Sequence, residues 1–317
     1  MNSKLLYFIF LFSVFFCHSQ YTEIINSNRP GSSHGAFAVG VNVFQLETGI
    51  SGHTLEHNNL NNSKIDGLNF NYLFRYGFLN EKLEVFLDGN IITRNIIDSN
   101  YVNNYSTDIK ETIIGKQTLG FKYLFFDPFK NKKWHSQSVY SWNANRKIRL
   151  VDFIPAISAI AGSSFNFDNR IQYDDLFFKV KQPLHPDLLI DNIMRMKTFN
   201  YPEQTISPFI GIATQHHFKG RWVVVNNFFY EIAMKNPTFP TNAETSNYNK
   251  INYMFTITYN LSNPNWSIFG EFQTFKNKIY SDDFFKFGIA NLTSKNSQVD
   301  LNFGGIFKTT PSYTYIN

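Results

Sequence analysis

The chain has very little cysteine, and its one cysteine lies near the N-terminus. Cys17 is that residue. It follows an apolar stretch from Leu5 to Phe16, which has Lys4 in front of it, and small residues continue to Ser19. This arrangement predicts a signal peptide over residues 1–19 that is cleaved after Ser19. An apolar stretch of only about a dozen residues is too short for a helix that crosses a bilayer.

Cleavage would leave an exported chain without cysteine, which excludes disulfides and thiolate-bound zinc as ways of holding the fold together. The remaining sequence also has no apolar run long enough for a transmembrane helix. Charge is scarce too. The formal net charge is +5 over 317 residues, and the basic residues are scattered, which argues against a nucleic-acid partner.

Aromatic residues, by contrast, are abundant, at 18% of a chain whose mean hydropathy is −0.26. In several segments large apolar residues recur at every second position, most clearly from Leu68 to Tyr76. One side of that segment carries Leu68, Phe70, Tyr72, Phe74 and Tyr76, and the other carries Asn69, Asn71, Leu73 and Arg75. A period of two marks a β-strand with two unlike faces. The apolar face would meet a second sheet in a soluble sandwich and lipid in a membrane barrel.

Eleven segments are strand candidates, and a last strand begins at the C-terminus. The expected strands lie at 44–51, 68–76, 83–91, 118–125, 150–165, 206–216, 222–232, 251–260, 266–274, 284–292 and 299–307, with residues 311–317 beginning the last one. Bacterial barrels have even strand numbers, so we predict an all-β, antiparallel transmembrane β-barrel of about 12 strands, in a range of roughly 10–14. We assign residues 41–317 to this barrel, with short periplasmic turns and longer outer loops, including 97–108 and 166–204. Residues 20–40 lack the pattern and form a periplasmic or lumen-entering segment.

The link between the second and third strands is the most informative short stretch. A two-residue turn at Leu79-Asn80 would place Arg75 directly opposite Glu84 on the polar face. In this register Phe74 meets Val85, Tyr72 meets Leu87, and Leu73 meets Phe86. Arg75 and Glu84 would then either line a pore or form an interior ion pair that holds the hairpin, and we favour the ion pair.

Polar residues that share this inner face are candidates to line the lumen. They are Asn71, Arg75, Glu84, Asp88, Lys122 and Glu271. Strand aromatics are candidates for the interfacial girdles of a barrel, although strands of any kind favour aromatics. They are Tyr72, Tyr76, Tyr123, Trp222, Tyr230, Tyr253, Tyr259 and Trp266.

Neither a metal site nor an enzyme is expected. His216 and His217 are adjacent, so on a strand they point to opposite faces and cannot share one ion unless the strand ends there. Barrel phospholipases carry a serine two residues after a histidine, but Gln137 stands two residues after His135. Around His135 no Gly-x-Ser-x-Gly elbow stands in its place. We therefore predict no catalytic residues and no cofactor.

Several stretches resemble a family of outer-membrane proteins labelled for the meta-pathway of phenol degradation. They are Asn28-Arg29-Pro30-Gly31, Val43 to Gly49, Leu73 to Gly77 with Lys82 to Val85, Leu119 to Tyr123, and Val299 to Asn302 with Thr310-Pro311. The likeness is good over residues 26–125 and returns from about 205. It implies an outer-membrane barrel with a transport function, and it marks Arg29, Pro30 and Gly31 as an N-terminal family motif. Family members usually end on a full strand, whereas residues 311–317 are short.

Two functions fit these expectations. The first is a passive channel or transporter for small compounds, hydrophobic ones included. The second is a structural or partner-binding barrel in a surface or secretion complex. In both, the chain would lie in the bacterial outer membrane, in contact with lipid and lipopolysaccharide, after handling by the barrel assembly machinery. A third interpretation is a secreted soluble β-sandwich. Sequence does not separate the first two, because the radius of the lumen depends on strand number and shear.

Overall fold

The chain is described by a computed structural model that covers residue 28 and residues 31–57, 63–100, 105–130, 153–165, 206–218, 221–232, 234, 249–276, 281–306 and 313–316. These residues form twelve strands: β1 (Phe44–His57), β2 (Ser63–Gly77), β3 (Leu83–Asn100), β4 (Tyr105–Phe126), β5 (Ala156–Phe165), β6 (Ile206–Phe218), β7 (Trp222–Glu231), β8 (Lys250–Asn260), β9 (Trp266–Lys276), β10 (Ser281–Ser294), β11 (Ser297–Ile306) and β12 (Tyr313–Ile316). One 3-10 turn, η1 (Pro128–Lys130), follows β4. Within these ranges no helix is both long and apolar enough to cross a membrane.

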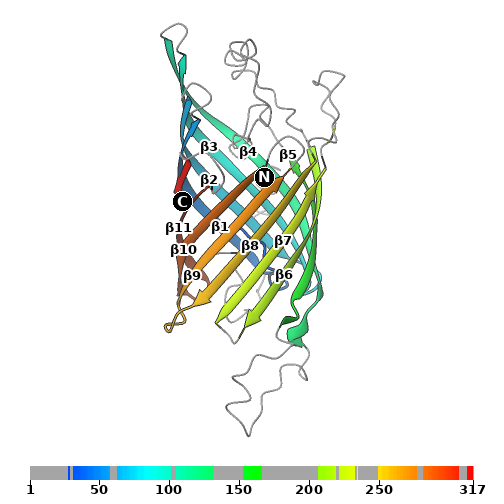
Figure 1. Cartoon of the computed structure of the whole chain (residues 1–317). Helices are drawn as coiled ribbons and strands as arrows, with labels where there is room; N and C mark the ends of the chain where they lie inside the picture. Colours follow the sequence, from blue (N-terminus) through cyan, green and yellow to red (C-terminus); the bar gives the residue numbers. More distant parts are fainter. Residues whose placement is uncertain are drawn as a thin grey trace, which may run out of the picture.

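The strands form one closed, antiparallel barrel in which each strand pairs with its neighbours in the chain (Figure 1). The circle closes through β12, which pairs with Gly52–Leu55 of β1 on one side and with Phe303–Gly305 of β11 on the other. The predicted fold class and the predicted strand number are therefore confirmed. The short closing strand spans only four residues.

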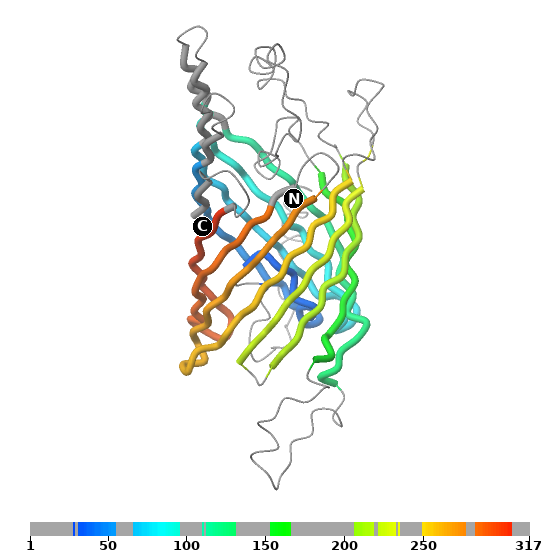
Figure 2. Tube along the Cα trace, viewed as in Figure 1, coloured from blue at the N-terminus to red at the C-terminus, as the bar shows by residue number. Residues whose placement is uncertain are grey.

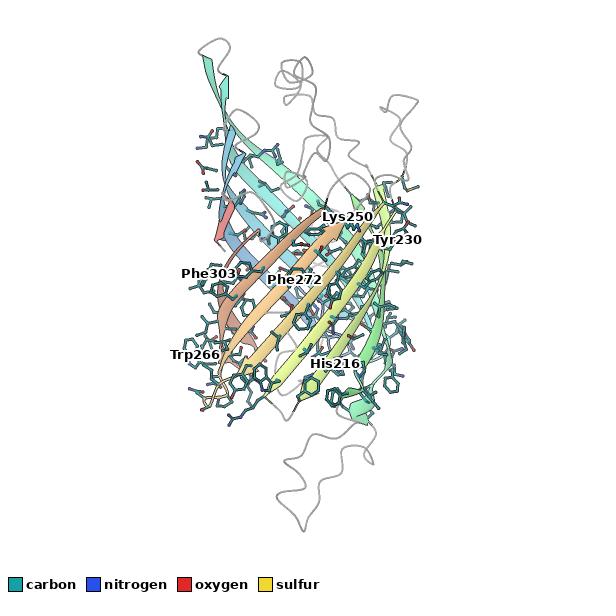
Figure 3. All side chains as sticks on the ribbon, viewed as in Figure 1. His216, Tyr230, Lys250, Trp266, Phe272 and Phe303 are labelled. Carbon is teal, nitrogen blue, oxygen red and sulfur yellow. The ribbon has the colours of Figure 1, made fainter. Side chains whose placement is uncertain are left out.

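The two faces of the barrel wall differ in polarity as the alternation predicted. On β1, Phe44 and Ile50 are 60% and 72% exposed on the outside, while Glu47 and Ser51 are buried on the inside. Figure 3 shows the side chains on the wall, including Phe272 and Phe303, both exposed on the outer face. A wall that is apolar outside and polar inside suits a barrel surrounded by lipid.

Exposed aromatic residues lie at the ends of several strands that meet short turns. Trp222 begins β7 and Trp266 begins β9, and each is exposed. The Trp222 ring lies 4.5 Å from that of Tyr259, near the end of β8. This placement is typical of an interfacial girdle, where amphipathic rings have one apolar and one hydrated end.

The β2–β3 hairpin has a different register from the predicted one. Its loop runs from Phe78 to Lys82, longer than a two-residue turn, and the Phe78 N–H donates to the Leu83 carbonyl at 3.2 Å. Arg75 consequently lies opposite Phe86. The other pairs shift likewise, to Phe74 with Leu87, Tyr72 with Gly89, and Leu73 with Asp88. A slip of two residues changes partners but preserves faces, because side chains alternate with a period of two.

The β3–β4 hairpin is longer than predicted. The expected loop at 97–108 is partly wrong, since β3 continues to Asn100 and β4 begins at Tyr105 in continuous register. Figure 1 shows this hairpin rising beyond the neighbouring strands, at the end opposite the short turns.

Some expectations fall on residues outside the described ranges. They are the signal peptide at 1–19, the loop at 166–204, the candidate residues Arg29 and Pro30, and the histidine at position 135. Of the expected strand at 150–165, the described residues 156–165 form β5 and residues 153–155 are not part of a strand.

Candidate functional site

Residues 31–43, which we call the inner segment, lie inside the barrel and lead into β1. Figure 2 shows this blue start of the described chain within the ring of strands. Its end is fixed to β2: the Asn42 N–H donates to the Gly77 carbonyl at 2.8 Å, and the Gly77 N–H donates to the Val43 carbonyl at 3.1 Å. A Cβ at Gly77 would overlap the carbonyl oxygens of Val39 and Gly40. Only glycine therefore allows this close approach.

Four side chains of alternating charge form a row across the inner face of β1 to β4. Arg75 Nη1 lies 3.2 Å from Glu47 Oε1, and Arg75 Nε lies 2.8 Å from Glu84 Oε1. Lys122, opposite Glu84 in register, places Nζ 3.3 Å from Glu84 Oε2. The side chains of Arg75, Glu84 and Lys122 are 0% exposed. Each charge in the row thus has an opposite charge beside it, which burial requires.

This charged row also binds the main chain of the inner segment. Glu84 Oε2 accepts the Val39 N–H at 2.9 Å, and Lys122 Nζ donates to the Gly35 carbonyl at 3.0 Å. These are charge-assisted bonds, which are stronger than neutral ones. The row therefore has two roles: its ion pairs link β1 to β4, and its hydrogen bonds fix the inner segment to this wall.

The opposite wall binds the same segment through β6, β7 and β9. Asn227 of β7 is fully buried and pairs with both main-chain groups of His34: its Oδ1 accepts the N–H at 2.6 Å, and its Nδ2 donates to the carbonyl at 2.7 Å. Gln215 of β6 accepts the Ala36 N–H at 3.0 Å. Glu271 of β9 accepts the Ser32 N–H at 2.6 Å. The inner segment is thus held from both sides of the barrel.

The wall beside His34 is apolar rather than polar. Phe86, Ile160, Phe209 and Ala213 form a buried cluster against which Leu73 and Phe229 pack. The His34 ring lies 5.1 Å from the Phe86 ring and 5.9 Å from the Phe229 ring, measured between centroids. Burial, and then the positive charges of Lys122 and Arg75, lower the pKa of His34 to about 3. The imidazole is therefore neutral at physiological pH.

Four of the predicted lumen-lining residues make contact with this site. Arg75, Glu84, Lys122 and Glu271 are buried on the inner face. Two others lie elsewhere on that face: Asn71 Nδ2 lies 3.5 Å from Ser51 Oγ, and Asp88 lies opposite Leu73 and Thr118. A role of any of them in transport stays a prediction.

Of the predicted N-terminal motif, the described residue is Gly31. Its φ is +100°, and a Cβ there would lie 2.5 Å from Glu271 Oε2. Glycine is therefore needed both for the backbone conformation and for the close approach. His217 contacts the ring of Phe37 at 5.9 Å between centroids, whereas His216 stacks on Phe218. Among the described residues no group of three metal-ligating side chains is present.

Sequence reasoning missed Asn227, Gln215, Glu47 and Lys286 as functional residues. Lys286 lies opposite Glu271 and donates to the Ser32 hydroxyl at 2.7 Å. The inward orientation of Asn227, Glu47 and Lys286 could have been found from the alternation, because each has an exposed apolar residue beside it. Their binding partners could not have been found from the alternation, since these partners belong to a distant segment, residues 28–36.

The C-terminal part of the chain matches a known protein family. Residues 197–317 match the family described as "Putative MetA-pathway of phenol degradation". The family resemblance predicted from the sequence is confirmed on this C-terminal part. The N-terminal motif lies outside the matched residues, so its assignment stays a prediction. No curated protein matches the chain.

Two solved structures resemble the chain to different degrees. The outer membrane channel from Pseudomonas putida F1 has 10% sequence identity and a TM-score of 0.52, and the match covers 91% of this chain and 94% of that one. The CymD monoaromatic hydrocarbon channel has 10% identity and a TM-score of 0.39, with 88% and 77% covered. The first of these shows that the chain has the fold of an outer-membrane barrel.

Proposed function

We propose that the protein is an outer-membrane channel for small solutes and that the inner segment closes its lumen near the short-turn end. The observation that carries this proposal is the set of bonds from opposite walls to one segment. Glu84 and Lys122 bind it from β3 and β4, and Asn227 and Glu271 bind it from β7 and β9. A segment held from both sides lies across the path of a solute.

The mixed lining of the lumen supports small solutes that include hydrophobic ones. The charged row over β1 to β4 makes one part of the wall polar, while Phe86, Phe209 and Phe229 make another part apolar. Sites that bind organic molecules usually combine a mainly apolar wall with a few polar groups. The likeness in fold to an outer membrane channel agrees with this proposal.

The bonds that hold the segment are suited to release. Between Gly31 and Phe37 the wall binds the segment through wall side chains, mostly to the segment's main chain and, from Lys286, to the Ser32 hydroxyl. Ladder-type bonds to β2 lie at Asn42 and Val43. Each such side-chain bond contributes only about 1 kcal/mol net, and those to charged groups somewhat more. The segment can therefore leave while the barrel ladder stays intact.

Deletion of residues 31–36 tests this function. We expect the full chain in planar bilayers to give rare or small currents, and the deletion variant to give larger, long-lived ones. Liposome swelling with small uncharged solutes should rise in parallel. The shift in gel mobility on heating, a property of folded barrels, checks that the variant is folded. A folded deletion variant that neither conducts nor swells liposomes would refute the channel, and co-purification of a partner would then favour the structural alternative.

A further inference from the structure

Three inward phenylalanines lie on glycines of the adjacent strand. In register, Phe86 is opposite Gly120, Phe209 is opposite Gly162, and Phe229 is opposite Gly211. These three pairs follow one another along β3 to β7. A Cβ at Gly120 or Gly211 would overlap the phenylalanine ring across from it, and one at Gly162 would come within 2.9 Å of Phe209 Cζ. Each ring therefore packs closely against the wall, over a glycine of the adjacent strand.

The His34 ring already uses this surface. It is tilted by 44° against Phe86 and stands edge-on, at 73°, to Phe229. Phe209 and Phe229 are themselves edge-on, with centroids 6.0 Å apart. Tilted and edge-to-face arrangements at such distances are the favourable ones for aromatic rings.

The position of His34 is set by its main chain rather than by its ring. Asn227 binds both the N–H and the carbonyl of His34. The polar contact of the ring is with Asn28, whose Nδ2 lies 3.4 Å from His34 Nδ1. Its depressed pKa makes the ring uncharged. The apolar surface therefore contacts a neutral, flat, five-membered ring, which is attached to the inner segment.

We propose that Phe86, Phe209 and Phe229 form a binding site for a small uncharged molecule with a flat ring, and that His34 occupies this site in the closed state. The inference rests on the proposed channel function and names its solute class. A solute ring that takes the place of His34 removes the side-chain packing of the inner segment, and so favours release of that segment. Uncharged rings are preferred because a charged group here would lose hydration without a partner of its own.

The site can be tested without any measurement of conductance. The probe is 4-fluorobenzyl alcohol, observed by fluorine NMR on the full chain in detergent. Because His34 competes for the site, we expect its removal in His34→Ala to lower the apparent Kd of the probe by about tenfold. Asn227→Ala, which leaves the phenylalanines intact and frees the main chain of His34, should shift the Kd in the same direction.

Competitors and matched variants define the specificity. Benzyl alcohol should displace the probe from His34→Ala, whereas cyclohexylmethanol, similar in size but not flat, and benzylammonium, flat but charged, should displace it poorly. Adding Phe86→Leu and Phe229→Leu to His34→Ala should abolish binding. The matched control is Phe272→Leu, which changes an outward phenylalanine on β9 and should leave binding unchanged.

Two results would overturn the ring site: equal displacement by benzyl alcohol and cyclohexylmethanol, or an unchanged Kd in both His34→Ala and Asn227→Ala. These outcomes are separable from failure of the channel. Ring binding by a barrel that stays sealed after deletion of residues 31–36 refutes the channel alone. A conducting deletion variant without ring binding in His34→Ala refutes the ring site alone.

Discussion

Among single residues, Glu84 joins two buried cations of the wall to the inner segment. It accepts from Arg75 Nε at 2.8 Å and Nη2 at 2.9 Å, lies 3.3 Å from Lys122 Nζ, and also accepts the Val39 N–H. Both basic partners are 0% exposed. Loss of this one negative charge would leave two buried positive charges with reduced compensation, a costly state in a protein interior.

Glu84→Gln should therefore destabilise the folded barrel. Removing one partner of a buried charge pair typically costs about 3 kcal/mol or more. The measurement is the free energy of unfolding in urea, followed by tryptophan fluorescence of the protein in lipid vesicles. Glu81→Gln is the control, because Glu81 pairs with Lys130 at 3.0 Å in the open and is 74% exposed. Exposed pairs contribute about 0–1 kcal/mol, so equal effects of the two substitutions would contradict the stabilising role of the buried row.

The sequence was sufficient to identify Arg75 and Glu84 but not Asn227 or Gln215. The first two are charged residues on an otherwise alternating strand, and charge on the inner face is visible in the pattern. Asn227 and Gln215 are ordinary amides, and their partners His34 and Ala36 lie 193 and 179 residues away. No local preference encodes a side chain that binds the main chain of so distant a segment.

Among elements, the β2–β3 hairpin shows that the alternation predicts the face of each residue but not its partner on the neighbouring strand. The face on which each side chain lies could be predicted from the alternation, because a period of two assigns every residue to one side of the strand. Register depended on the loop, where Leu79 adopts φ +62°. Leucine is uncommon in that region, so residue preferences gave no reason to expect a loop longer than two residues. Arg75 reaches Glu84 in either register, since a diagonal neighbour is within reach of a long side chain.

The junction between the inner segment and β2 depends on the absence of a Cβ at Gly77. Gly77→Ala should force the segment away from β2, since a methyl group would overlap the Val39 and Gly40 carbonyl oxygens. Overpacking of this kind costs about 1–3 kcal/mol, and displacement of the segment should also raise channel conductance. Urea unfolding and planar-bilayer currents measure the two effects.

Gly270→Ala is the matched control for this substitution. A Cβ at Gly270 meets only Ile257 Cγ2 at 3.8 Å, an ordinary contact. Its stability should change by no more than about 0.5 kcal/mol, as for substitutions that disturb no packing. If Gly77→Ala were as stable and as closed as Gly270→Ala, the close approach would not be what holds the segment.

For the whole molecule, the sequence was sufficient to predict the barrel but not the position of the inner segment within it. Alternation, an even strand number and a polar inner face predicted a twelve-stranded barrel, because every strand must satisfy the same two environments. The occupied lumen was not predictable to the same degree. Residues 31–43 carry no periodic signal, and their position follows from bonds to strands that are distributed around the barrel.

The asymmetry of the barrel's two ends predicts its orientation in the membrane. Short turns connect strands at one end, as at 261–265, while the β3–β4 hairpin extends from the other (Figure 1). In outer-membrane barrels short turns face the periplasm and long loops face outward. Single cysteines can test this, because the only native cysteine, Cys17, belongs to the predicted signal peptide. Both test positions, Ser262 in the short turn and Lys110 in β4, are exposed.

In intact cells, a maleimide that cannot cross the outer membrane should label Lys110→Cys and spare Ser262→Cys. After the outer membrane is permeabilised, both variants should be labelled equally, since both positions are exposed. The unmodified chain, treated in the same way, measures any background from retained Cys17. Labelling of Ser262→Cys alone in intact cells would mean the opposite orientation. The inner segment would then close the lumen from the cell surface instead of from the periplasm.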